Sequence, residues 1–151
     1  MFEEKQIDTN MDIFKKKALS EKGAILGLIC RGKLSEGIDF PDGLCRAVII
    51  VGVPYANIRD PFIIEKKNHL DNIAKQSINK NNVLKGDDWY FMGTVRSINQ
   101  ALGRVIRHAK DYGMIFFIDK RYQESKFNQH LPAWVTESME SVEMPMPILY
   151  N

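Results

Sequence analysis

Apolar residues gather in three short runs, separated by longer stretches of mixed polarity. The runs are Ala24–Cys30, Ala47–Val51 and Met114–Ile118, and each is bounded by glycine, proline or a charged residue. A continuous apolar run of this length is typical of a strand that is buried on both faces, as in a parallel sheet. The pattern therefore predicts three buried strands.

The stretches that follow the second run show the spacing of helices. Pro61–Ile73 has helical spacing, and a longer segment from Trp89 to His108 follows a polar linker, Asn79–Asn82. Asp87 and Asp88 stand where an N-cap belongs, just before the longer segment. Strands that alternate with helices predict an α/β fold with a mostly parallel sheet flanked by helices.

The two ends of the chain differ from this alternating part. Residues 1–20 hold a weak amphipathic segment interrupted by three lysines, and Leu131–Val135 is a short amphipathic piece before a coil rich in methionine and proline. We therefore divide the chain into an amino-terminal helical segment over residues 1–23, an α/β domain over residues 24–135 and a coil tail over residues 136–151.

The segment from Trp89 to His108 has two distinct faces when placed on a helix at about 100° per residue. One face is apolar, as expected of a helix that docks on a sheet. The opposite face carries Gln100, Arg104 and Arg107 within roughly 60°. The apolar face consists of Phe91, Val95, Ile98, Leu102 and Val105.

Gly103 lies beside this polar stripe, where it costs about 1 kcal/mol of helix propensity relative to alanine. Its presence indicates the close approach of another backbone or of a ligand. Two guanidinium groups one turn apart, Arg104 and Arg107, can grip a phosphate. The same pattern also fits a solvated helix face, so it suggests a phosphate site without establishing one.

Composition and charge narrow the possible partners. The chain has 151 residues, of which 44% are hydrophobic and 26% charged, as in an ordinary globular domain. It contains no apolar run long enough to span a membrane and no signal peptide, so we expect an intracellular protein without membrane contact. The formal charge of +2 is too small to attract nucleic acid or anionic lipid in general, so any such contact must be local.

Two candidate chemistries are not favoured by the residue spacing. Cys30 and Cys45 lack the neighbours of a zinc site and are expected to be reduced thiols. Gly27–Lys33 fits the first seven places of a phosphate-binding P-loop, but Leu34 replaces the hydroxyl residue that binds magnesium. Since the residues after Gly27 also continue an apolar strand, we reject this match.

Two segments read together resemble a known family. Arg31–Phe40 and Asn99–His108 resemble motifs V and VI of superfamily 2 iron–sulfur DNA helicases of the XPD/Rad3 type. The similarity extends from about Ala24 to Val135, and within the family it is greatest to the branch of the regulator of telomere elongation helicase and FANCJ. Further matches are Gly52–Tyr55, Asp60–Pro61, Leu70–Asp71, Asp111–Gly113, Asp119–Tyr122 and Leu131–Val135.

This resemblance implies the second RecA-like, P-loop NTPase-type domain of a two-domain motor. In such a motor ATP and Mg²⁺ lie in the cleft between the domains, and single-stranded DNA crosses above both. By carry-over, Arg107 is the arginine finger, Arg104 a second phosphate contact or brace, Gln100 a polar contact in the cleft, and Gly103 part of the ATP site. An arginine finger is worth about 10³ to 10⁵ in rate in GTPases.

The resemblance also assigns the motif V turn. Gly37 and Asp39 are then at the nucleotide, while Lys33, Ser35 and Glu36 face the DNA. From the residues alone, a polar loop in which Asp39 caps the next element is the simpler interpretation. We interpret His108 separately, as a cation that interacts favourably with the end of a helix.

Several family features are not found in this sequence. It contains no P-loop, no Asp-Glu box for magnesium and no set of four cysteines, which the family carries in its first domain. The resemblance therefore implies that ATP and Mg²⁺ are shared with a first motor domain, and that the 4Fe-4S cluster belongs to that missing part. The second domain is itself predicted to be incomplete, as in a truncated or split gene product.

The function expected from these observations is that of the carboxy-terminal motor part of an ATP-dependent DNA helicase. The family implies movement in the 5′ to 3′ direction, a nuclear location and a role in DNA repair and telomere maintenance. The chain alone is expected to be inactive. Two alternatives remain open: a non-catalytic module that binds nucleic acid or protein, and a fragment without independent activity.

Overall fold

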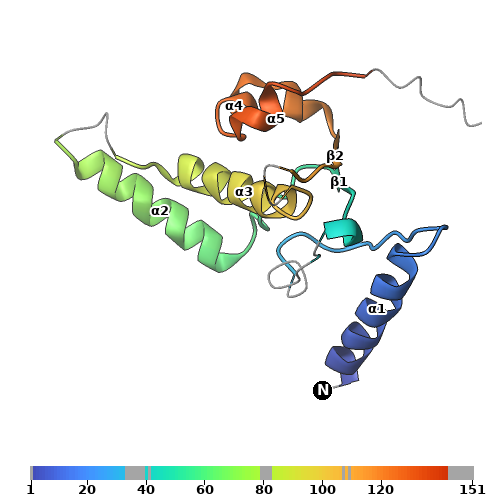
Figure 1. The fold of residues 1–151 in the computed structure, drawn as a ribbon. Helices are drawn as coiled ribbons and strands as arrows, with labels where there is room; N and C mark the ends of the chain where they lie inside the picture. The colour runs from blue at the N-terminus through green and yellow to red at the C-terminus, as the bar shows by residue number, and fades with distance from the viewer. Residues whose placement is uncertain are drawn as a thin grey trace, which may run out of the picture.

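The computed structural model describes residues 2–32, 40, 42–78, 83–106, 108 and 110–142. From Ala47 onward, the described chain forms a strand, two longer helices, a second strand and then short helices (Figure 1). The elements in chain order are α1 (Phe2–Ala18), η1 (Asp42–Leu44), β1 (Ala47–Val51), α2 (Pro61–Gln76), α3 (Gly86–Leu102), β2 (Met114–Ile118), η3 (Lys120–Gln123), α4 (Ser125–Asn128) and α5 (Ala133–Thr136).

Strands β1 and β2 form the sheet of the described part of the chain, and both lie where the sequence predicts them. They pair in parallel, with Ala47 opposite Met114 and Val51 opposite Ile118. Parallel neighbours need a crossover connection, and here α2 and α3 provide it. The small parallel sheet with its helices is part of the predicted α/β, RecA-like fold.

Each strand buries only one of its faces, so the prediction of strands buried on both faces is wrong. Exposure alternates along β1 and β2, and the outward side chains Ile49 and Phe116 are 53% and 45% exposed. The inward residues pack against α3, α4 and α5, which lie on the same side of the sheet. The other face stays open among the described residues, where Val51, Met114 and Ile118 are 76%, 60% and 46% exposed.

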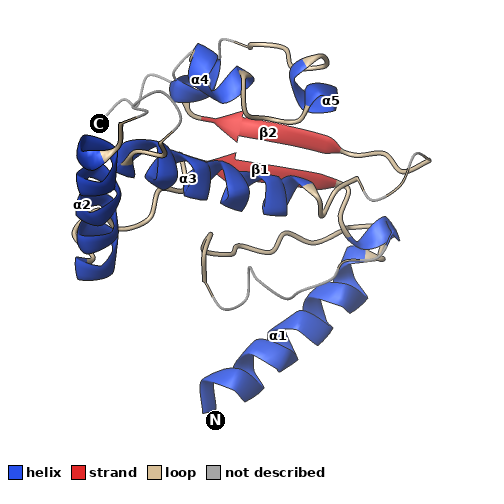
Figure 2. Ribbon diagram, turned by 90° about the vertical axis from the view of Figure 1, so that its left-hand side faces the viewer, coloured by secondary structure: helices blue, strands red, loops and turns tan. Residues whose placement is uncertain are grey.

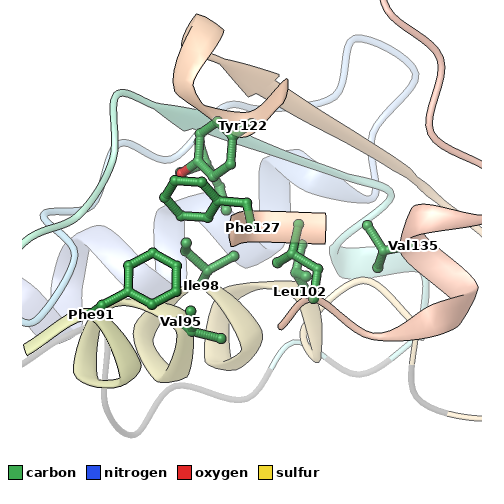
Figure 3. Close-up of a cluster of buried hydrophobic side chains, with 9 residues drawn as sticks. Phe91, Val95, Ile98, Leu102, Tyr122, Phe127 and Val135 are labelled. Carbon is green, nitrogen blue, oxygen red and sulfur yellow. The ribbon is translucent and has the colours of Figure 1, made fainter. Parts of the chain in front are cut away.

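The hydrophobic core lies between the sheet and this helical layer (Figure 3). Helix α3 contributes most of one wall, and the apolar face predicted for it is buried as expected. Fully burying a side chain of this size contributes about 1.5–3 kcal/mol. The cluster comprises Ile50, Phe91, Val95, Ile98, Leu102, Tyr122, Phe127, Leu131 and Val135.

The third predicted strand is absent from the described structure. Ala24–Ile29 has no regular secondary structure, and Ile25 and Ile29 are 94% and 84% exposed. A strand needs a neighbour to pair its backbone, and no ladder to this segment forms among the described residues. The prediction that this apolar run forms a buried strand is thus wrong for the described structure.

The same segment nevertheless runs alongside β1 and in the same direction. Near its start, the Cδ2 of Leu19 lies 3.7 Å from where a Cβ on Gly43 would be. At its end, the Nε of Arg31 donates to the carbonyl of Pro54 at 3.0 Å. Figure 2 shows the segment beside β1 on the side away from β2.

Helices α2 and α3 pack side by side, and their starts explain the packing. Asp60 caps α2 by accepting from the Phe62 amide at 2.8 Å, with Pro61 at the first position. Gly86 starts α3 against α2, where a Cβ would lie 2.7 Å from the Lys67 carbonyl oxygen. The predicted linker Asn79–Asn82 lies outside the described residues.

Both ends of α3 differ from the prediction. Its N-cap is Lys85, so Asp87 and Asp88 lie in the first turn, where carboxylates favour the helix dipole, rather than at the cap. The helix ends at Leu102 instead of reaching His108, because the chain must turn there to enter β2 at Met114.

The predicted elements at the two ends of the chain are present. Helix α1 lies within the predicted amino-terminal helical segment and ends at Ala18, and its Phe14 ring packs edge-on against Phe40 at 5.5 Å. Helix α5 overlaps the predicted amphipathic piece and ends one residue beyond it, at Thr136, and residues 143–151 of the tail lie outside the described residues. None of the described helices combines the length and apolarity needed to cross a membrane.

Candidate nucleotide and nucleic-acid site

The described residues of motif VI lie together at the carboxyl end of α3. Gln100 is exposed on the last helical turn, Gly103 is the C-cap and Arg104 is half-buried in the turn that follows. Arg107 lies outside the described residues. Because the helix ends at Leu102, Gln100 and Arg104 of the predicted stripe do not lie on one continuous helical face.

Gly103 has a simpler role than the predicted close approach. A Cβ there would meet the Asn99 and Gln100 carbonyl oxygens at 3.5 and 3.9 Å, which are ordinary contacts. Its amide donates to the Asn99 carbonyl at 3.0 Å, and the Arg104 amide then bonds the Ala101 carbonyl at 3.2 Å. A poor helix former at this point ends α3 and sends the arginine segment into a turn.

A clamp holds this turn against the start of the sheet. Arg46, just before β1, contacts Asp111 at 2.6 Å and donates to the Tyr112 carbonyl at 2.9 Å. Its guanidinium also lies 4.2 Å from the centre of the Tyr112 ring. The Asp111 carboxylate is 4% exposed, so the pair is partly desolvated and charge-assisted. We call Arg46, Asp111 and Tyr112 the loop clamp.

Gly113 completes the attachment of the loop over residues 103–113. A Cβ on Gly113 would overlap the Cγ1 of Val105 and would lie 3.0 Å from the Arg46 carbonyl oxygen. Val105 is 1% exposed, so it cannot give way. The loop is therefore held to the core at Val105 and at Gly113, and Arg104 directly precedes the first of these positions. Neither the role of Arg46 nor that of Gly113 followed from sequence reasoning, because their partners are remote in the chain.

The motif V residues predicted to contact ATP and DNA lie outside the described residues: Lys33, Ser35, Glu36, Gly37 and Asp39. The described entry to that turn is Arg31, whose φ is 66°. Besides its bond to Pro54, the Arg31 guanidinium lies 3.6 Å from where a Cβ on Gly93 would be. Arg31 thus ties the start of motif V to both the loop after β1 and the helix that leads to motif VI.

The helix-end interpretation of His108 is wrong. Helix α3 ends six residues earlier, at Leu102, so its dipole does not act at this ring. The Nδ1 of His108 instead accepts from the Lys110 amide at 3.3 Å.

A second polar cluster lies at the carboxyl ends of the strands. Asp119 follows β2 and accepts from the amide, Nε and Nη2 of Arg121 at 2.9, 2.9 and 2.6 Å. These bonds lower the pKa of the Asp119 carboxyl to about 2. Tyr122 next to it donates to the Gly52 carbonyl at 3.0 Å, and burial raises the pKa of this phenol. The sequence marked these residues as family matches without giving them a role.

Two tyrosines and two cations form a stack above this cluster. The rings of Tyr55 and Tyr90 lie 5.4 Å apart at an angle of 8°. The Arg121 Cζ lies 5.9 Å from the Tyr55 ring centre, and the Lys67 Nζ lies 5.2 Å from that of Tyr90. We call these four residues the cation–aromatic ladder. Because they come from four separate segments, no sequence pattern predicts that they stack together, although Tyr55 and Arg121 lie in segments that match the family.

The two groups of residues lie at opposite ends of α3. The helix runs from the ladder, with Tyr90 in its first turns, to the motif VI turn after Leu102. From Gly93, where Arg31 docks, to Leu102 the helix rises roughly 14 Å. One helix therefore connects Arg31, which precedes the predicted DNA-binding turn, with Arg104, which follows the end of the helix.

The donor groups in the described part bear on which cofactors it can hold. No three histidine, cysteine, aspartate or glutamate side chains gather there in a way that could bind a metal ion. Cys30 and Cys45 are not joined in a disulfide, and two cysteines cannot ligate a four-cysteine iron–sulfur cluster. The guanidinium of Arg104, by contrast, suits a phosphate oxygen.

Comparisons with known proteins bear on the whole chain. A family model described as the helicase C-terminal domain matches residues 1–138. The chain is 44% identical over 131 residues to the regulator of telomere elongation helicase 1 homolog of Drosophila willistoni, with 86% of the chain covered. Its identity is 42% to the Drosophila persimilis protein of the same name and 40% to that of Drosophila melanogaster. The chain spans only 13% of the length of each of these relatives.

Proposed function

Since this chain belongs to the helicase C-terminal domain family, in superfamily 2 helicases of the XPD/Rad3 type, we propose that it supplies the arginine-bearing half of an ATP cleft. The whole protein is then an ATP-dependent DNA helicase that moves 5′ to 3′ and acts in the nucleus. Arg107 is the arginine finger, Arg104 a second phosphate contact or brace, and Gln100 a polar contact beside them.

The observation that carries this proposal is the pinned loop after α3. Arg104 leaves the helix in a turn whose two ends are fixed, by Val105 and Gly113 in the core and by the buried Asp111 carboxylate on Arg46. A preorganised cation loses little conformational entropy when a phosphate arrives and stabilises developing charge effectively. A merely solvated arginine stripe would not require such an attachment.

The cofactors follow from this division of the cleft. ATP and Mg²⁺ are held mainly by a first motor domain, which supplies the phosphate loop and the metal ligands. This chain adds charge from Arg104 and Arg107, while Gly37, Asp39 and Gly103 lie on the nucleotide side of the cleft. When bound, Mg²⁺ would offset part of the negative charge of the phosphates.

The DNA contacts belong to the motif V turn in this proposal. Lys33, Ser35 and the backbone near Glu36 face the phosphates of single-stranded DNA. The docking of Arg31 on Pro54 and against Gly93 supports a mechanical link from this turn to α3 and so to the arginine loop. When DNA moves at one end of α3, the helix thereby transmits the displacement to the arginine loop at its other end.

The test is ATP hydrolysis by a hybrid helicase. The Drosophila willistoni relative, with its matching segment replaced by this chain, supplies a first motor domain at 44% identity over 131 residues. We expect DNA-stimulated hydrolysis, and we expect Arg107→Ala to reduce its rate by about 10³ to 10⁵, as for arginine fingers elsewhere. Arg104→Ala should also reduce it, by a smaller factor if Arg104 is a brace.

The matched control is Lys110→Ala, which removes an exposed cation from the same loop. It should leave the rate unchanged within about two-fold, as expected for an exposed charge at a distance from the phosphate. An active hybrid that tolerates Arg107→Ala would contradict the proposal and favour a non-catalytic binding module.

A further inference from the structure

The cation–aromatic ladder is a surface feature as well as a packing feature. Tyr55 is 37% exposed and the Arg121 side chain is 44% exposed, while Tyr90 and Lys67 lie deeper. The Tyr90 hydroxyl donates to the Ala56 carbonyl at 2.6 Å, and the Tyr55 amide donates to the Val53 carbonyl at 2.8 Å. The outer ring is thus fixed both by its own backbone turn and by the ring below it.

Arg121 is held equally firmly. Its Nε and Nη2 donate to the two Asp119 carboxylate oxygens at 2.9 and 2.6 Å, which fixes the plane of the guanidinium. Among the described residues, its Nη1 is left for an outside acceptor. A planar cation and a planar ring at the surface, both already ordered, can receive a flat ligand with an attached anion at low entropic cost.

We propose that the ladder is a platform for unpaired nucleic acid, on which a base stacks on the outer face of the Arg121 guanidinium, beside the exposed edge of the Tyr55 ring, while the Nη1 of Arg121 binds the adjacent phosphate. Aromatic rings interleaved with cations are the usual means of binding single strands without sequence preference. This inference rests on the proposed function in one respect: the ladder adds a second surface to the DNA track that we propose for the motif V turn.

The place of the ladder in the fold agrees with this assignment. Tyr55 directly follows Pro54, whose carbonyl receives Arg31 at the entry to the motif V turn. The ladder therefore adjoins the segment predicted to face DNA, at the carboxyl ends of β1 and β2. This is the edge at which open α/β sheets bind their ligands.

The charge around the ladder determines what kind of binding to expect. Lys67 is paired with Asp87 at 2.7 Å and Arg121 with Asp119, so the local charge is nearly balanced. Binding should depend mainly on stacking and only weakly on salt, with a slope of about 0.7 in log affinity against log salt for each phosphate contact. Duplex DNA, whose base faces are covered, should bind less tightly than a single strand of the same length.

The experiment is a fluorescence anisotropy titration of a labelled oligothymidylate with the purified 151-residue chain. Tyr55→Leu should weaken binding by at least about five-fold, the lower limit for loss of one stacked base, whereas Tyr55→Phe should keep the affinity. Arg121→Gln should lower the salt slope by about 0.7. Trp134→Leu is the matched control, because it removes a half-exposed aromatic ring from α5.

A purely structural role for the ladder is separated by two further readouts. Tyr55→Leu should abolish the preference for single strands over duplex while the unfolding midpoint shows the chain still folded. Photo-cross-linking to an oligonucleotide that contains iododeoxyuridine should label Tyr55. Equal losses for Tyr55→Leu and Trp134→Leu, or no binding by the unchanged chain, would overturn the inference.

Lys33→Ala separates this inference from the proposed function. If Lys33→Ala weakens binding and Tyr55→Leu does not, the motif V contact stands and the ladder platform is wrong. If only Tyr55→Leu weakens binding, the platform stands and the motif V assignment fails.

Discussion

At the scale of single residues, the pairing of Asp119 with Arg121 fixes both the start of η3 and the outer cation of the ladder. The pKa of Asp119 is lowered from 3.8 to about 2 by its hydrogen bonds from Arg121. A carboxyl with a depressed pKa contributes stability that is fully present above its unfolded pKa and is lost as the pH falls through its folded pKa.

We therefore predict that Asp119 contributes to stability above pH 3.8 and that this contribution disappears as the pH falls toward about 2. In urea unfolding followed at a series of pH values, the midpoint of Asp119→Asn should lie below that of the unchanged chain at neutral pH. The two midpoints should converge at the acid end. Parallel curves over the whole range would show that the carboxylate does not stabilise the fold.

The loop clamp gives a second prediction at this scale. Asp111→Ala leaves Arg46 without its partner beside the start of β1, and breaking a buried pair costs about 3–5 kcal/mol. Because the Arg46 side chain is 36% exposed, the loss of unfolding free energy should be smaller, about 2 kcal/mol. Lys110→Ala in the same loop should cost less than about 0.5 kcal/mol. Equal costs in a urea titration would contradict the clamp.

At the scale of elements, sequence patterns correctly identified which side chains of α3 pack in the core, but they placed the end of the helix too far along the chain. The apolar spacing of α3 continues through Val105, and Val105 is indeed buried, but the chain has already left the helix at Gly103. Periodicity reports which side chains face the core and is insensitive to a turn that keeps them there. Gln100 therefore lies in the helix and Arg104 lies in the turn after it, an arrangement that a helical wheel cannot represent.

The segment Ala24–Cys30 gives the prediction for this scale. It runs beside β1 in parallel, between the Leu19 and Arg31 contacts, but it forms no ladder in the described structure. We expect the amides of residues 25–29 to exchange rapidly with solvent in the chain alone. In the hybrid helicase, further sheet should hold this segment against β1, and the exchange should slow. Slow exchange in the chain alone would show that the strand is already formed.

At the scale of the whole molecule, one face of the sheet packs against helices of this chain, and the other face is exposed among the described residues. The core beneath the sheet is closed by α3, α4 and α5, whereas the opposite face exposes Val51 at 76% and Met114 at 60%. The sequence predicted the α/β class and, through its resemblance, the family. It could not predict the open face, the clamp or the ladder, because these depend on contacts between residues far apart in the chain.

We propose that this chain is half of an ATP-hydrolysing motor. The most direct measurement is ATP hydrolysis by the purified chain, with and without single-stranded DNA, beside the hybrid helicase under the same conditions. We expect no turnover of ATP by the chain alone. For the hybrid, we expect turnover that is stimulated by DNA and lost in Arg107→Ala. Turnover by the chain alone, abolished by Lys33→Ala and Arg107→Ala, would contradict it and show that the rejected loop at Gly27–Lys33 completes a nucleotide site.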